Sequence, residues 1–194
     1  MSSNPTRRGV LAGFAAVPIL AAPSVVHAFG DALPVEREQT GAMRNISSFT
    51  RRKWEDHFEQ IGVGAIVCDV ASRAVHFWSP QGNYHIFPSS VPKTDELTKR
   101  GYTEVVRKKV GPDWRPTASM LETDPDLPRY VGPGPDNPLG THAMYLGWPA
   151  YLIHGTHDTR KIGRPSSSGC FGLYNEQVAS LFPMVEIGTQ VRVI

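Results

Sequence analysis

From Gly62 onward the chain is divided into short apolar runs separated by turn residues, and this spacing constrains the fold more than any other feature. Gly64–Val70, Ala74–Trp78 and Asn83–Phe87 are rich in β-branched and aromatic residues and are joined by short polar turns. Runs of this kind in close succession predict an antiparallel meander. Further strands are predicted at Tyr102–Val110, Ala143–Leu146, Ala150–Ile153 and Gly188–Ile194.

Short helices and one long loop complete the predicted domain. Ser47–Glu59 has aromatic residues spaced among charges and predicts a short amphipathic helix capped by Ser47 or Ser48. Pro112–Pro138 contains seven prolines and predicts a loop. Asn175 is the predicted N-cap of a helix through Phe182, before Pro183. With no internal repeat and no second core, we expect one mainly β domain with one or two short surface helices.

The first 28 residues have the composition of an export signal. Arg7 and Arg8 form a twin-arginine motif before an uncharged, Ala-rich run, and Val26-His27-Ala28 predicts cleavage after Ala28. The alternative is an uncleaved membrane anchor, since the apolar run is about long enough to cross a bilayer. Cleavage would remove two of the 20 basic residues and leave 18 against 18 acidic ones. A neutral chain gives no argument for nucleic-acid binding, and we expect no stable membrane span after cleavage.

Three segments follow from this organisation: a signal peptide at 1–28, an N-terminal arm with a short helix at 29–61, and a catalytic domain at 62–194. The catalytic interpretation depends on His154 and Cys170. His154 follows a predicted buried strand, and Cys170 follows a flexible Ser-Ser-Ser-Gly run whose backbone amides can approach a reacting atom. An unperturbed thiol has a pKa of about 8.5, and a nearby histidine can lower it to about 6. The pair therefore predicts a cysteine nucleophile with a histidine base.

Two other interpretations of these residues remain open at this point. An exported protein meets an oxidising environment, so Cys68 and Cys170 could form a disulfide. His154, His157 and Cys170 could instead hold zinc with water in the fourth position. The sequence has no His-Glu-x-x-His pattern, and His157 lies in a polar loop, so we expect no metal and no other cofactor.

The motifs around the pair resemble those of the L,D-transpeptidase family, the YkuD or ErfK/YbiS catalytic domain. They are Tyr151-Leu152-Ile153-His154-Gly155-Thr156, then Ile162-Gly163, then Ser167-Ser168-Gly169-Cys170. The resemblance extends over about Gly62–Ile194 and implies a β-sandwich-like catalytic fold. It also implies peptidoglycan stem peptides as donor and acceptor, and acylation of Cys170 by carbapenem-type β-lactams.

In the mechanism that this resemblance implies, Cys170 attacks the carbonyl of the third stem residue and forms a thioester. His154 acts as base and acid, and the Gly169 carbonyl orients its ring. An amine of a second stem, usually that of diaminopimelate, then takes the acyl group in the periplasm. The residues expected to line the substrate site are Ser168, Gly155, Thr156, Arg164 and Asn175.

The chain departs from the family pattern at two places. Gly172 stands where the family usually has an arginine, and Arg160 or Arg164 is the expected replacement. The usual Thr-Pro-x-Gly-x-Phe segment reads Thr-Lys-Arg-Gly-Tyr-Thr at 98–103. These departures raise a 1–3 linkage, made to the L-alanine region of a stem, as an alternative to the common 3–3 linkage. Two further alternatives are an L,D-carboxypeptidase or endopeptidase that passes the thioester to water, and a catalytically silent wall-binding module.

Overall fold

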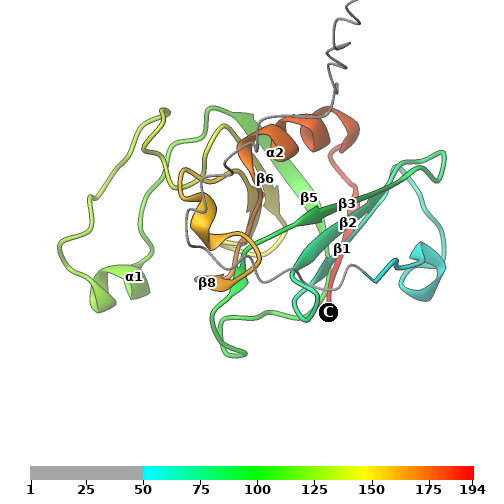
Figure 1. The fold of residues 1–194 in the computed structure, drawn as a ribbon, viewed down its shortest axis with the longest axis horizontal. Coiled ribbons are helices and arrows are strands. Elements are labelled where there is room, and N and C mark those ends of the chain that lie inside the picture. The colour runs from blue at the N-terminus through cyan, green and yellow to red at the C-terminus, as the bar shows by residue number, and fades with distance from the viewer. Residues whose placement is uncertain (1–49) are drawn as a thin grey trace, which may run out of the picture. The chain divides into compact units, whose positions relative to one another are not determined.

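The computed structural model describes residues 50–194 and confirms a mainly β fold (Figure 1). Eight strands form one sheet in the order β3-β2-β1-β10-β5-β6-β7-β9, and β4 and β8 form a separate pair. The strands are β1 (Ala65–Asp69), β2 (Ala74–Trp78), β3 (Tyr84–Pro88), β4 (Val91–Pro92), β5 (Gly101–Val110), β6 (His142–Leu146), β7 (Leu152–His154), β8 (Pro165–Ser167), β9 (Phe171–Gly172) and β10 (Gln190–Val193). The helices are α1 (Ala118–Thr123) and α2 (Asn175–Leu181), with short 3-10 turns η1 (Trp54–Asp56), η2 (Thr159–Lys161) and η3 (Phe182–Met184).

The long strand β5 joins two halves of the sheet. Its first half pairs antiparallel with β10 up to Glu104, and its second half pairs antiparallel with β6 from Val105 onward. The ladder to β6 is irregular between Val105 and Arg107, as at a β-bulge, which bends a strand and increases its twist. One half therefore contains β1–β3 and β10, the other β6, β7 and β9, and the core lies between them.

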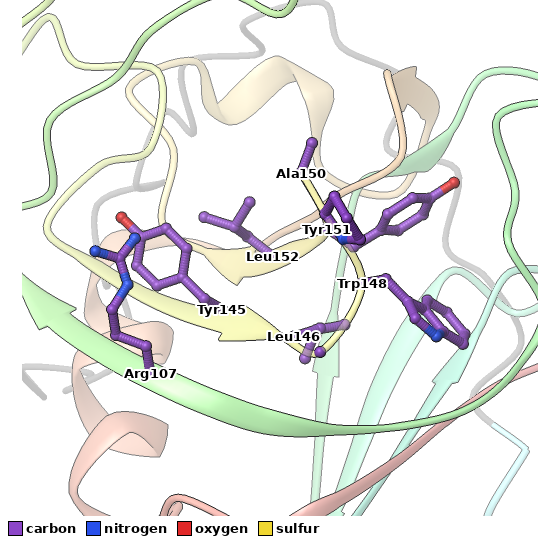
Figure 2. A pocket seen from close by; sticks show the side chains of 9 residues that line it. Arg107, Tyr145, Leu146, Trp148, Ala150, Tyr151 and Leu152 are labelled. Atoms are coloured by element: carbon purple, nitrogen blue, oxygen red, sulfur yellow. The ribbon is translucent and has the colours of Figure 1, made fainter.

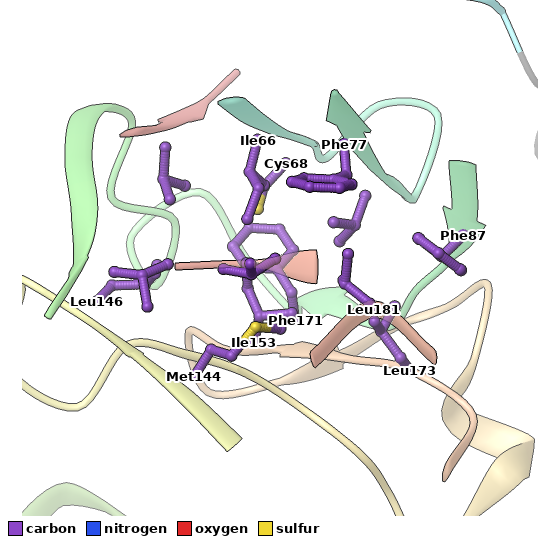
Figure 3. Close-up of a cluster of buried hydrophobic side chains, with 14 of the residues drawn as sticks. Ile66, Cys68, Phe77, Phe87, Met144, Leu146, Ile153, Phe171, Leu173 and Leu181 are labelled. Carbon is purple, nitrogen blue, oxygen red and sulfur yellow. The ribbon is translucent and has the colours of Figure 1, made fainter. Parts of the chain in front are cut away.

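The main core is filled from both halves of the sheet and from α2. Figure 3 shows Ile66 and Phe77 of the β1–β2 side facing Met144 and Ile153 of the β6–β7 side, with Phe171 between them. Each of these five side chains is fully buried. A core closed from two sheet layers is the arrangement expected of a β-sandwich.

The predicted meander is confirmed, because β1, β2 and β3 pair antiparallel in sequence order. The parallel pairs β1–β10 and β7–β9 were not predicted, since they join segments far apart in the chain. The proline-rich loop was predicted without a helix, which was wrong: α1 lies within it, and the Thr117 side chain caps its first turn. Asn175 is the first residue of α2, not its N-cap, which is Tyr174.

The N-terminal predictions lie mostly outside the described residues. These include the signal at 1–28 and the arm as far as residue 49. From residue 50 on, the only helical turn in the predicted helix Ser47–Glu59 is η1, and Trp54, Phe58 and Ile61 pack with residues of β1 and β2 in a second apolar cluster. In the part of the chain from residue 50 on, none of the helices has the length and apolar character needed to cross a bilayer.

We predict that Phe77→Ala lowers the free energy of unfolding by about 3–5 kcal/mol, because it removes a fully buried ring and leaves a cavity in the main core. Urea unfolding monitored by circular dichroism measures the change. The matched control is Val110→Ala on β5, where the side chain is 64% exposed, and we expect a change within about 0.5 kcal/mol. Equal effects of the two substitutions would contradict this placement of the core.

Candidate active site

The parallel pairing of β7 with β9 brings His154 and Cys170 together. His154 is the register partner of Gly172 on β9 and of Ala143 on β6. Alternate residues of a strand share one face, so the side of the sheet that carries His154 also carries Cys170, two residues before Gly172. Cys170 packs there on the apolar cluster of Leu139, Ala143 and Leu152, on the face opposite the main core.

His154 is a buried, neutral imidazole with a fixed orientation. It is 8% exposed, and Nδ1 donates a hydrogen bond to the carbonyl oxygen of Gly155. Because a carbonyl can only accept, Nδ1 carries the proton and Nε2 keeps its lone pair. Burial lowers the pKa of His154 to about 4, and the Gly155 carbonyl offsets this only in part. The orienting carbonyl is that of the next residue, Gly155, whereas the sequence prediction named Gly169.

Cys170 is a half-buried thiol whose Sγ donates to the carbonyl of Ala150 at 3.3 Å. Burial raises the pKa of Cys170 to about 11, and a hydrogen bond from the Leu152 backbone offsets this in part. Ala150 has a φ of 64°, the left-handed region that non-glycine residues seldom adopt. This turn between β6 and β7 therefore directs the carbonyl that holds the thiol at rest.

Burial favours a neutral thiol and a neutral imidazole in the resting pair, because it disfavours the charged form of both groups and shifts their pKa values in opposite directions. The thiolate inferred from the sequence stays a prediction.

The turn before Cys170 is held by Ser167. Its hydroxyl donates to the Cys170 carbonyl at 2.6 Å and accepts from the Gly169 amide at 3.3 Å. Gly169 has a φ of 133°, and a Cβ there would lie 3.2 Å from the ring of Tyr151. Tyr151 in turn donates its hydroxyl to the carbonyl of Leu97 at 2.8 Å. These contacts fix the backbone that presents the thiol.

Asn175 holds the backbone around His154. Its Oδ1 accepts from the Thr141 amide at 3.1 Å, and its Nδ2 donates to the Thr156 carbonyl at 3.1 Å. A Cβ on Gly155 would lie 2.2 Å from Asn175 Oδ1, so only glycine fits between them. The Thr156 hydroxyl accepts from the Asp158 amide at 3.1 Å, and the residue is 4% exposed. Gly155, Thr156 and Asn175 thus form a packed framework next to His154, and their predicted contact with substrate stays a prediction.

Gly172, the position of the missing arginine, is enclosed by Ser90. The Gly172 amide donates to Ser90 Oγ at 3.0 Å, and the Ser90 amide donates to the Gly172 carbonyl at 2.8 Å. A Cβ at this position would lie 2.6 Å from Ser90 Oγ and 3.7 Å from Cε1 of His154. An arginine there would require Ser90 to move.

The remaining predicted site residues lie at the surface of the connection between β7 and β9. Ser168 and Arg164 are exposed, and Arg164 lies next to β8. Arg160 binds Asp158 through Nε at 2.8 Å and a second nitrogen at 3.0 Å, and this contact lowers the pKa of Asp158 to about 2. The Asp158 carboxylate therefore already engages the Arg160 guanidinium.

The disulfide and zinc alternatives are not supported by the described residues. Cys68 and Cys170 are both free thiols, and they lie in different apolar clusters. Between residues 50 and 194, no three His, Cys, Asp or Glu side chains form a group that could hold a metal ion. His157 is exposed, as its polar loop suggested.

A cavity of about 490 Å³ lies beside the turn between β6 and β7 (Figure 2). Its wall includes Ala150 and Leu152, whose backbone groups contact Cys170. Figure 2 shows Tyr145 with Arg107 on one side of the cavity and Trp148 with Tyr151 on the other. The lining residues are Arg107, Tyr145, Leu146, Gly147, Trp148, Pro149, Ala150, Tyr151 and Leu152.

Sequence reasoning missed Ser90, Ser167 and Tyr151 as parts of the site. Ser90 is 82 residues from its partner Gly172, so no local pattern indicates the contact. Ser167 and Tyr151 lie within the motifs that resemble the family, and their positions in the chain near Cys170 and His154 are the signal that could have indicated a place in the site. Their hydrogen-bond partners are backbone groups, which every residue type has and which a sequence pattern therefore cannot identify.

Comparison with known proteins gives one consistent family. The family model of the L,D-transpeptidase catalytic domain, YkuD, matches residues 64–193. A Fuscovulum blasticum protein assigned to the L,D-transpeptidases is 62% identical over 151 residues, which cover 77% of this chain and 79% of that protein. YbiS of Escherichia coli K12, also assigned as an L,D-transpeptidase, is 46% identical over 136 residues, which cover 68% of this chain and 44% of YbiS.

Solved structures support the fold. L,D-transpeptidase 3 from Mycobacterium tuberculosis superimposes with a TM-score of 0.56 at 15% identity, covering 68% of this chain and 61% of that one. An L,D-transpeptidase from Mycobacterium smegmatis gives a TM-score of 0.54 at 20% identity, covering 68% and 58%. The chain spans less than half the length of the Escherichia coli relatives that it matches.

We predict that alkylation of Cys170 by iodoacetamide accelerates about tenfold per pH unit from pH 7 to 10 and levels off near pH 11, because only the thiolate reacts. Stopped-flow mixing with intact-mass detection gives the rates. Cys170→Ser is the control, since its remaining thiol, Cys68, is fully buried and has a raised pKa. A plateau already reached at pH 6–7 would contradict the neutral pair.

We also predict that Asn175→Ala lowers the free energy of unfolding by about 1–3 kcal/mol, because the Thr141 amide and the Thr156 carbonyl lose their partner. Chemical denaturation measures this change. Glu176→Ala, an exposed neighbour on the same helix, is the control and should change stability by no more than about 0.5 kcal/mol. An Asn175→Ala protein as stable as the control would remove this residue from the framework of the site.

Proposed function

Because the chain belongs to the L,D-transpeptidase family through its YkuD catalytic domain, we propose that it is an exported enzyme that cross-links peptidoglycan stem peptides in the periplasm. The family as a whole acts in peptidoglycan cross-linking. The observation that carries the proposal is the shared face of His154 and Cys170, with Nδ1 of the imidazole fixed by the Gly155 carbonyl and Nε2 left as the base.

The first half of the proposed reaction makes a thioester. The Cys170 thiol leaves the Ala150 carbonyl and gives its proton to Nε2 of His154 as Sγ attacks the carbonyl carbon of the third stem residue. The imidazolium then returns this proton to the amine of the terminal D-alanine, the carbon–nitrogen bond breaks, and D-alanine leaves. The Gly155 carbonyl stabilises the imidazolium during the step because it accepts from Nδ1.

The second half transfers the acyl group to an amine of another stem. His154 takes the proton of the attacking amine, the new amide forms, and the thiolate leaves and recovers a proton. The negative oxygen that develops in both halves needs a donor. The Gly169 amide already bonds Ser167 Oγ, so the Cys170 amide is the donor that we assign to this oxygen.

Ser90 and Gly172 bear on the acceptor. They occupy the place beside His154 where the family usually has an arginine. The site therefore carries less positive charge beside His154 than the family pattern provides. This difference favours a 1–3 linkage, made to the L-alanine region of the acceptor stem, over the common 3–3 linkage.

We predict that a carbapenem acylates Cys170, detected as an adduct by intact-mass spectrometry. The strained amide of the β-lactam ring acylates the Cys170 thiol in the same way as the stem-peptide carbonyl does in the proposed reaction. The structure of the L,D-transpeptidase LdtMt1, which has a similar fold at 15% identity, was solved in complex with imipenem. Cys170→Ala should form no adduct, and His154→Ala should form it about 10²–10⁴ times more slowly.

Cys68→Ala is the control for this experiment and should be acylated at the rate of the unchanged protein, because Cys68 lies in the main core. An adduct that persists in Cys170→Ala would remove Cys170 as the nucleophile. Incubation of the unchanged protein with sacculi and mass spectrometry of the released muropeptides then identifies the bond. Dimers of 3–3 type alone would overturn the 1–3 assignment and keep the transpeptidase; new monomers without dimers would indicate hydrolysis.

A further inference from the structure

Arg107, Tyr145, Leu152 and Cys170 form a row across four neighbouring strands. Arg107 on β5 is the register partner of Tyr145 on β6, and Tyr145 is the partner of Leu152 on β7. The Leu152 backbone contacts Cys170, the residue immediately before β9. Three of the four residues, all but Cys170, line one cavity, as Figure 2 shows. The row therefore carries a cationic side chain in the cavity wall at one end, and at the other end Cys170, which contacts the wall residues Ala150 and Leu152.

The guanidinium of Arg107 is held flat on an aromatic ring. Its central carbon lies 3.6 Å from the centroid of the Tyr145 ring, the closest cation–π contact among the described residues. The neighbouring carboxylate of Asp113 pairs with Lys109 instead. No ion pair involves Arg107 in the part of the chain that begins at residue 50. Stacking leaves the edge of the guanidinium, with its fork of N–H donors, available to an anion.

The rest of the cavity is lined by apolar and aromatic side chains. Leu152 and Trp148 contribute hydrocarbon and ring surface, and Tyr151 directs its hydroxyl to the carbonyl of Leu97. Arg107 is the one charged residue in the lining of this cavity. In a mostly apolar site, a single charged side chain fixes the orientation of a bound ligand, because apolar contacts distinguish poorly between ligands. A planar guanidinium fork matches a carboxylate in two parallel hydrogen bonds.

We propose that Arg107 is a specificity-determining residue that binds a carboxylate of the donor stem peptide and so places its scissile carbonyl at Cys170. This inference rests on the proposed function and names the group that the cavity recognises. Neighbouring strands are about 4.8 Å apart, so the stacked guanidinium stands roughly 10 Å from the strand that carries the thiol.

Arg107 also supplies a positive charge that position 172 does not. A side chain at Gly172 would meet Ser90 Oγ, and the Arg160 guanidinium already binds Asp158. β5 and β9 lie on either side of β6 and β7, so Arg107 and position 172 stand on opposite sides of these two strands. The two carboxylates of a stem peptide that lie near the scissile bond are those of the terminal D-alanine and of the diaminopimelate side chain.

The test measures binding without chemistry. Calorimetry gives the dissociation constant of a stem tetrapeptide for the Cys170→Ala protein, with Arg107 unchanged and with Arg107→Gln. Three peptides are compared: one with both carboxylates free, one amidated at the terminal D-alanine, and one amidated at the diaminopimelate side chain. The control substitution is Arg51→Gln, because Arg51 stacks on Tyr84, 5.1 Å from its centroid, and lines no part of this cavity.

We expect Arg107→Gln to weaken binding of the free peptide about 10- to 100-fold, as for loss of a charge-assisted hydrogen-bond pair. Amidation of one carboxylate should cause the same loss and abolish the effect of Arg107→Gln, which identifies the carboxylate. Arg51→Gln should leave all affinities unchanged. Equal affinity of the free and both amidated peptides, an equal loss with all three peptides in Arg107→Gln, or no binding of the free peptide would overturn the proposal.

The same peptides separate this inference from the proposed function. With Cys170 present, intact-mass detection shows whether the bound free peptide forms a thioester. Carboxylate-dependent binding without a thioester leaves Arg107 as the recognition residue and removes the proposed reaction. A thioester that forms at the same rate with and without Arg107 keeps the reaction and removes Arg107.

Discussion

The parallel pairing of β7 with β9 is the constraint on which the site depends. It sets His154 beside Gly172 and so brings Cys170 to the same face of the sheet. The connection between these strands returns over β8, which pairs with β4 near Ser90. Parallel pairing needs such a crossover. The proposed catalytic pair is therefore brought to one face by the pairing of β7 with β9 and by the crossover that joins these strands.

Burial decides the state of the pair. Water is excluded from His154 by its neighbours on β6 and β9, and this holds the imidazole neutral at neutral pH. Burial also raises the pKa of the half-buried Cys170 thiol. A neutral pair costs little to bury, since neither group brings an uncompensated charge into the protein. The Gly155 carbonyl fixes which nitrogen is the base, and Asn175 fixes the backbone on the far side of Gly155.

Much of the fold follows from local pattern. The predicted run Ala74–Trp78 coincides with β2, and the closing strand contains β10, because both have strong β-formers bounded by turn residues. Local pattern fails where pairing is long-range. A strand of two residues such as β9 is too short to show a periodic pattern. The prolines on either side of α1 predict a loop and so obscure this short helix.

The order of amino acids alone indicates the chemistry proposed for this protein, because a histidine follows a buried strand and a cysteine follows a Ser-Gly turn within motifs typical of one family. How these two residues are held follows from the packed fold. The orienting carbonyl of Gly155, the contact of Ser90 with Gly172 and the row from Arg107 to Cys170 all join residues on different strands or backbone groups. Such contacts depend on strand register and on desolvation, which are properties of the packed molecule and not of any local stretch of chain.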